Sequence, residues 1–227
     1  MQGIARDITE RKRAEGERRV ISEIIQGVVT TPNLEELLNL IHNSISKIIP
    51  AENCYVALYE KKTGLLHLPL CRDKYDPIAS SMKLGKGLTA YVFREGYSML
   101  MTQPAIHQLI AKGDVELIGT LPSVWLGVPL KTSTETVGVL VVQHYEDSQA
   151  YSQRDVEFLT SVGGQIALAI ERKQSEAALR ENEAQFKDLF DHAKPSTKAT
   201  SDSWWAQLLH ALGHLLAWVR SLIASTA

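Results

Sequence analysis

The sequence has few cysteines and no excess of positive charge. Cys54 and Cys71 are the only two cysteines in 227 residues, and they have neither zinc-ligand spacing nor the number that a disulfide framework needs. The formal net charge of −2 argues against nucleic-acid binding, which usually requires a basic surface. The opening residues, MQGIARDITERKRAE, are charged where a signal peptide would be apolar. We therefore expect a cytoplasmic protein that does not bind nucleic acid.

The sequence also lacks a signature of catalysis. No base accompanies Cys54, Cys71 or any serine in a pattern typical of an activated nucleophile. What is present is a globular composition, with 44% hydrophobic and 22% charged residues, and a length that suits one domain plus flanking elements. We therefore assign no catalytic step and predict that the protein is not an enzyme.

The most informative stretch is residues 121–145, LPSVWLGVPLKTSTETVGVLVVQHY. It predicts two strands, 124–130 and 139–142, which are joined by a polar hairpin turn. Because the second strand is continuously apolar, we expect it to be buried on both faces. Pro129 lacks a backbone N–H and indicates a sheet edge or a bulge in the first strand.

Helical and strand patterns alternate along the rest of the chain. A charged helix with Asp7 or Thr9 as N-cap is expected to carry an apolar stripe of Ile21, Ile24, Ile25 and Val28. The other expected elements are a helix at 33–49, strands at 52–59 and 65–70, a short helix at 89–94, a short strand at 97–101, a short helix at 104–112, and a long helix from Ser152 to about residue 190. This order predicts an α+β fold with an antiparallel sheet.

Four segments resemble the GAF domain family. They are NCYVALY (53–59), GKGLTAYV (85–92), WLGVPL (125–130) and GVLVVQ (138–143), and QIALAIERK (165–173) completes the resemblance. The resemblance spans residues 18–172 and is greatest to the GAF modules of bacterial sensor histidine kinases and diguanylate cyclases. It implies long N- and C-terminal helices packed on one face of the sheet and short helices over the other.

The flanking segments resemble parts of PAS domains. Residues 1–17 are similar to the end of one PAS domain and its linker helix, and residues 173–193 to a signalling helix that leads into another. The resemblance implies a piece of a longer sensor that dimerises through its terminal helices. A seam with 4,3 spacing is expected along the last helix, and it consists of Ile166, Ile170, Lys173, Ala177, Arg180 and Ala184.

The C-terminal segment resembles neither family. Residues 194–203 read as a polar linker and residues 204–225 as an amphipathic helix. This helix is expected to pack on another helix; contact with a membrane and an appended, non-native origin are the alternatives. His210 and His214 have the i, i+4 spacing of metal ligands, but no third ligand accompanies them, so no metal site is predicted.

The resemblance implies a small-ligand pocket, with Tyr91, Arg94, Trp125 and Gln143 as candidate wall residues. For Trp125, packing in the core is the preferred interpretation. The cofactor, if any, is unknown, and His107 and His144 are the candidates for a haem ligand, although both are expected to be ordinary histidines. Two alternatives stay open: a redox enzyme that uses Cys54 or Cys71, and a ligand-free dimerisation scaffold.

Overall fold

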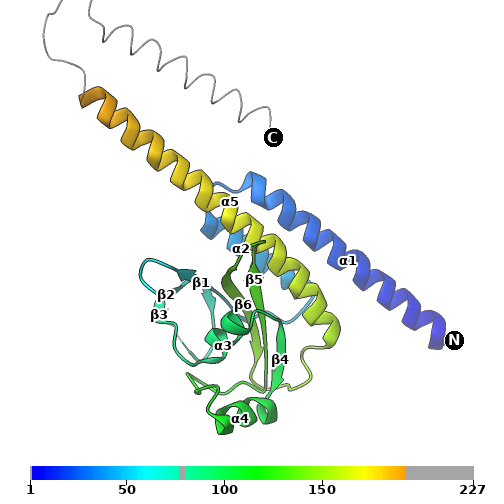
Figure 1. The fold of residues 1–227 in the computed structure, drawn as a ribbon. Helices are drawn as coiled ribbons and strands as arrows, with labels where there is room; N and C mark the ends of the chain where they lie inside the picture. The colour runs from blue at the N-terminus through cyan, green and yellow to red at the C-terminus, as the bar shows by residue number, and fades with distance from the viewer. Residues whose placement is uncertain (1, 77–79, 193–227) are drawn as a thin grey trace, which may run out of the picture. The chain divides into compact units, whose positions relative to one another are not determined.

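The computed structural model describes residues 2–76 and 80–192 (Figure 1). One compact unit ends at Ala178, and a second begins at Leu179. The first contains the whole sheet, while the described part of the second is the end of the last helix. The expectations for residues 194–203 and 204–225, including His210 and His214, lie outside the described residues. Among the described helices, none is long and apolar enough to cross a membrane.

The sheet has six antiparallel strands in the order β3-β2-β1-β6-β5-β4. The strands are β1 (Asn53–Glu60), β2 (Leu65–Arg72), β3 (Ser81–Lys83), β4 (Met99–Thr102), β5 (Val124–Lys131) and β6 (Thr136–His144). As the continuous apolar run predicts, β6 lies in the interior of the sheet between β1 and β5, and residues 139–142 are fully buried.

Each face of the sheet has its own hydrophobic core. One face packs against α1 (Gln2–Thr30), α2 (Leu34–Ile45) and α5 (Gln153–His192), whose buried side chains include Ile24, Ile41 and Ile166. The other face carries α3 (Leu88–Glu95) and α4 (Gln103–Lys112), which supply Val92 and Ile106 to the second core (Figure 1). The predicted α+β arrangement, with long helices on one face and short helices on the other, is confirmed.

Local chemistry explains where several helices begin and end. The Asn33 side chain accepts a hydrogen bond from the backbone N–H of Glu36 and so caps α2. At the start of α5, both the backbone N–H and the hydroxyl of Ser152 donate to Asp155 Oδ2, at 2.7 and 2.6 Å. Helices α3 and α4 end at Gly96 and Gly113, which adopt left-handed conformations that favour glycine.

The two strand prolines lie where the ladder is interrupted. Pro129 pairs with Val139 of β6, and the pairing between β4 and β5 stops at Gly127, so β5 has an open edge beyond that point. Pro69 lies at a bulge, because the β1–β2 register shifts between Val56 and Leu58. Both positions avoid the loss of a ladder hydrogen bond, which the sequence predicts for Pro129.

Helices α1 and α5 run side by side in the same direction (Figure 1). Arg13 forms an ion pair with Asp155 near the beginning of α5, and Lys173 Nζ donates to the carbonyl oxygen of Thr31 at 2.9 Å. Both contacts join residues that are 142 positions apart in the sequence. The alignment of the two helices is therefore the same at both contacts.

Three sequence expectations need correction. Helix α1 begins at Gln2, before the predicted caps Asp7 and Thr9, and Ile25 of its apolar stripe is 47% exposed. Strand β3 was not predicted, because its three residues are too short for a period to show. The expected dimer seam begins with Ile166 and Ile170, but both are buried against the sheet and cannot reach a second chain.

Candidate ligand-binding site

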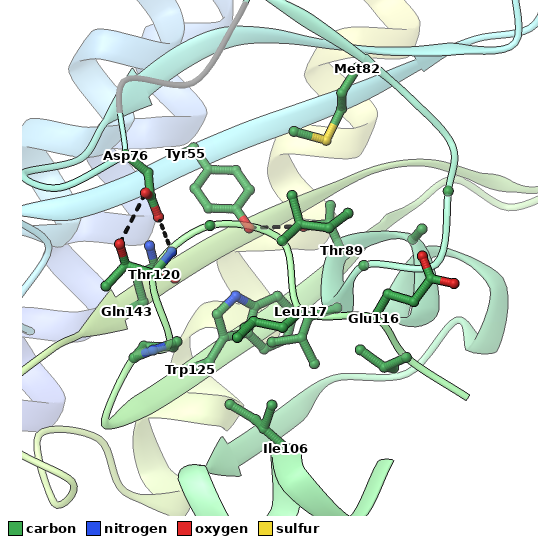
Figure 2. A pocket seen from close by; sticks show the side chains of 18 of the residues that line it. Tyr55, Asp76, Met82, Thr89, Ile106, Glu116, Leu117, Thr120, Trp125 and Gln143 are labelled. Atoms are coloured by element: carbon green, nitrogen blue, oxygen red, sulfur yellow. Dashed lines mark hydrogen bonds between the residues drawn. The ribbon is translucent and has the colours of Figure 1, made fainter. Parts of the chain in front are cut away.

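A cavity of about 330 Å³ lies on the face of the sheet that carries α3 and α4 (Figure 2). Strands β1, β2, β3, β5 and β6 supply one wall, and the turn before α3 with that helix supplies another. The loop formed by residues 115–122 closes it, and Ile106 of α4 contributes one side chain. Its volume falls at the lower end of the range for small-molecule sites.

The floor of the cavity is apolar and is dominated by Trp125. This side chain is only 2% exposed, and it lies beside Leu117 and Ile106 in Figure 2. The indole ring covers Gly127 on the same strand, because a Cβ atom at residue 127 would come within 2.1 Å of the ring. Glycine at 127 is therefore what allows the ring to lie flat along β5.

Two hydroxyl groups form a pair in the wall. Tyr55 of β1 and Thr89 of α3 lie 2.8 Å apart between their oxygen atoms and join the sheet to the helix (Figure 2). Burial raises the pKa of Tyr55 to about 12, although hydrogen bonds with Thr89 and Trp125 act in the opposite direction. Tyr55 is consequently neutral at physiological pH and offers a hydroxyl, not a charge.

Asp73 organises the polar end of the cavity. Its carboxylate accepts hydrogen bonds from Gln143 Nε2 at 2.6 Å and from the hydroxyl of Tyr145 at 2.9 Å. It also accepts the backbone N–H of Asp76 at 3.0 Å, which folds the chain after β2 into a tight turn. Burial and the Asp73 carboxylate raise the pKa of Tyr145 well above its usual range. One carboxylate thus fixes both Gln143 and Asp76.

Asp76 holds the loop that closes the cavity. The backbone N–H and the hydroxyl of Thr120 donate to the two carboxylate oxygens of Asp76, at 2.7 and 3.1 Å (Figure 2). At the other end of the loop, the backbone N–H of Glu116 donates to the carbonyl oxygen of Lys86 at 2.9 Å. Between these attachments, Ile118 is 61% exposed although it also lines the cavity.

The four candidate residues from the sequence divide into two pairs. Trp125 and Gln143 line the cavity, and Trp125 also belongs to the core. Tyr91 lies outside the lining, in a shallow groove beside β4 and α4. Arg94 is also outside it, and its Nη1 donates to the carbonyl oxygen of Gly85 at 2.8 Å, which fixes the turn before α3.

Several wall residues were not predicted from the sequence. Tyr55 and Thr89 belong to segments that carry the family resemblance, but neither has a pattern that distinguishes a wall residue from a core residue. Asp73 and Asp76 lie in the loop after β2, where the sequence has no periodicity to place them. Only the three-dimensional approach of this loop to β6 and to Thr120 brings Asp73 into contact with Gln143 and Asp76 into the lining of the cavity.

The histidine and cysteine candidates are separate from the cavity. His107 is exposed on α4, and His144 Nδ1 accepts the backbone N–H of Asp147 at 2.9 Å; neither lines the cavity. Cys54 and Cys71 point to opposite faces of the sheet, because Cys71 pairs directly with Tyr55, the neighbour of Cys54. Within the described part of the chain, no cluster of three or more potential metal ligands occurs.

Comparisons with known proteins identify a family model and a curated relative. A family model described as a GAF domain matches residues 31–171. A curated relative is the methyl sulfide methyltransferase-associated sensor of Methanosarcina acetivorans, 24% identical over 209 residues. The match covers 84% of this chain and 20% of that relative, so the chain spans about a fifth of its length.

Solved structures show the same fold. The GAF domain of a phosphoenolpyruvate-protein phosphotransferase from Coxiella burnetii is 19% identical, with a TM-score of 0.59, over 73% of this chain and 98% of that one. The free methionine-R-sulfoxide reductase of Neisseria meningitidis is 15% identical, with a TM-score of 0.57, over 70% and 91%. At these identities the likeness concerns the fold alone.

Proposed function

The chain belongs to the GAF domain family, and from this we propose that it is a sensory module that couples a small ligand in its cavity to its terminal helices. The proposal places it in a longer cytoplasmic sensor of the histidine kinase or diguanylate cyclase type, between two PAS domains. The coarser statement, a sensory or regulatory GAF module, agrees with the name of the curated relative. No catalytic step is assigned to it.

The observation that carries this proposal is that the cavity and the helices lie on opposite faces of the same strands, β5 and β6. Trp125 and Gln143 are directly paired across β5 and β6 and line the cavity. Their neighbours Leu126 and Val142 are also paired and belong to the opposite core, with α1 and α5. A shift of the strands on the cavity side therefore also moves the surface on which the helices pack.

The ion pairs between α1 and α5 provide a defined connection for the signal. Glu17 of α1 accepts two hydrogen bonds from Arg154 of α5, at 2.9 and 3.2 Å, and one from Arg13 at 3.1 Å. Arg13 in turn pairs with the buried Asp155. Since the two helices also run in parallel, we propose that a displacement of α1 passes directly to α5.

A second copy of the chain is proposed to pack along α5. Its exposed large apolar side chains, Leu168, Leu179, Phe186 and Leu189, fall on positions with 4,3 spacing (168, 172, 175, 179, 182, 186, 189). This is the spacing of a coiled coil. It lies two residues away from the seam that the sequence suggested, because the residues of that seam at 166 and 170 are used by the core.

Light scattering on the full chain tests the dimer. We expect a dimer for the wild type and a monomer for the double variant Leu179→Glu and Phe186→Glu, because two charges would be buried in the seam. The matched control, Ala177→Glu and Ala184→Glu, places the same charges on the other candidate seam and should leave the dimer intact. A monomeric wild type, or dissociation only in the control, would contradict the proposed packing.

The geometry of the cysteines does not favour the redox alternative. Burial raises the pKa of the Cys54 thiol to about 12, so the thiolate that a nucleophilic cysteine requires is absent at neutral pH. Cys71 projects from the other face of the sheet, and the two sulfur atoms cannot form a disulfide without refolding β1 and β2. The ligand-free scaffold is the remaining alternative, and the presence of the cavity favours ligand binding over it.

A further inference from the structure

Hydrogen-bond acceptors dominate the polar end of the cavity. The Asp73 carboxylate can only accept, so the nitrogen is the atom of the Gln143 amide that faces it. This leaves Oε1, an acceptor, as the amide atom available to a ligand. Gln143 is itself only 7% exposed, and its side chain is held in place by two hydrogen bonds from Nε2, to Asp73 and Tyr145.

Asp76 adds a negative charge to the same end. Each of its two oxygens accepts one hydrogen bond from Thr120. Because a carboxylate can accept about four hydrogen bonds, about two acceptor positions of Asp76 remain for a ligand. Among the described residues, Asp76 has no salt-bridge partner. The other charged lining residues, Lys83 and Glu116, are both exposed at the rim, so Asp76 is the charged lining residue that is partly buried.

A single carboxylate sets the positions of these two acceptors. Asp73 binds Gln143 through Oδ2 and the backbone of Asp76 through Oδ1. Both acceptors therefore stand next to each other at one end of a cavity whose floor is Trp125 and Ile106. A ligand that satisfies this arrangement has donors and a positive charge at one end and an apolar body at the other.

We infer that the cavity binds a small organic ammonium compound, with its charged amino group between Asp76 and Gln143 and its apolar part against Trp125. This inference rests on the proposed function, because it specifies the ligand class of the same cavity. Asp76 has a double role in it. The carboxylate that receives the ammonium group is also the one that holds Thr120, so binding is linked to the loop that closes the cavity.

Three probes with the same branched apolar body test the ligand class: 3-methylbutylamine, 3-methylbutanol and 3-methylbutanoate. Binding to the full chain is followed by the NMR methyl signals of Met82 and Ile106, which both line the cavity. We expect the amine to bind about tenfold more tightly than the alcohol, as a charge-assisted hydrogen bond implies, and the carboxylate to bind least. The preference for the amine should decrease with increasing salt.

Two variants distinguish the loss of the Asp76 carboxylate from the loss of one negative charge elsewhere on the protein. Asp76→Asn retains an acceptor for Thr120 and should bind the amine and the alcohol with equal affinity. Asp114→Asn makes the same change at an exposed residue outside the lining and should retain the wild-type preference. The unchanged methyl spectrum of each variant without a probe serves as the check that it is folded.

The possible failures are distinguishable. If the methyl signals shift equally with all three probes, or if Asp76→Asn retains the preference for the amine, the ligand class is wrong and the cavity still stands as a binding site. If none of the three probes shifts the signals of Met82 and Ile106, the cavity does not accept small ligands, and the proposed sensory function is overturned together with the ligand class.

Discussion

Replacing Asp155 with alanine is expected to lower the free energy of unfolding by about 2–4 kcal/mol. The side chain is buried, with the residue only 4% exposed, and it has two structural roles. It accepts two hydrogen bonds from Ser152 at the start of α5, and it pairs with Arg13 of α1. The substitution removes the cap of one helix and the connection to the other at once, and it leaves Arg13 with Glu17 alone.

Urea unfolding followed by circular dichroism measures this loss of stability. Two further variants show which feature of the Asp155 side chain causes it. Asp155→Asn retains an acceptor for Ser152 without the charge, so it should fall between the wild type and alanine. Glu157→Ala, an exposed carboxylate two residues along the same helix, should change stability by less than about 0.5 kcal/mol. A loss in Asp155→Ala no larger than that of the Glu157 control would show that the connection between α1 and α5 does not stabilise the fold.

Replacing Trp125 with alanine is expected to destabilise the protein by about 3–5 kcal/mol. The indole ring is almost completely buried, it covers Gly127, and it packs with Tyr55 and Ile106 in the core on the cavity side. Its removal also joins a new void to the existing cavity, and the rigid strands β5 and β6 cannot collapse to fill it.

Chemical denaturation again provides the measurement, and Tyr97 provides the control. Tyr97 is a large aromatic residue that is 54% exposed, so its replacement with alanine should cost less than about 1 kcal/mol. Trp125→Phe retains most of the apolar contact and should lose less than Trp125→Ala. If Trp125→Ala is as stable as the Tyr97 variant, the ring is not a core element and the cavity floor is assigned incorrectly.

The sequence predicts those parts of the fold that depend on local patterns. The apolar run in β6 is found where it was expected, and the caps at Asn33 and Ser152 and the helix-ending glycines each have a local physical cause. Pro69 and Pro129 likewise indicate, without knowledge of the strand pairing, where the hydrogen-bond ladder between strands is interrupted.

The candidate site was less predictable, because it is assembled from distant segments. Gln143 and Trp125 were identified since they lie on strands whose order the family resemblance implies. Asp73 lies 70 positions before its partner Gln143, and Asp76 lies 44 positions before its partner Thr120, both in a loop without periodicity. The core role of Ile166 and Ile170 is hidden for a related reason: their 4,3 pattern does not reveal whether they face the core or a second chain.

We propose that the state of the cavity changes the packing of α1 and α5. Amide hydrogen exchange in the full chain tests it, with Ala90→Phe as a variant that fills the cavity from α3 and Ala111→Phe as an exposed control. We predict that filling the cavity changes protection in residues 10–30 and 153–172, while the control leaves both segments as in the wild type. If the changes in Ala90→Phe stay confined to α3 and the loop at residues 115–122, the cavity and the terminal helices are not coupled.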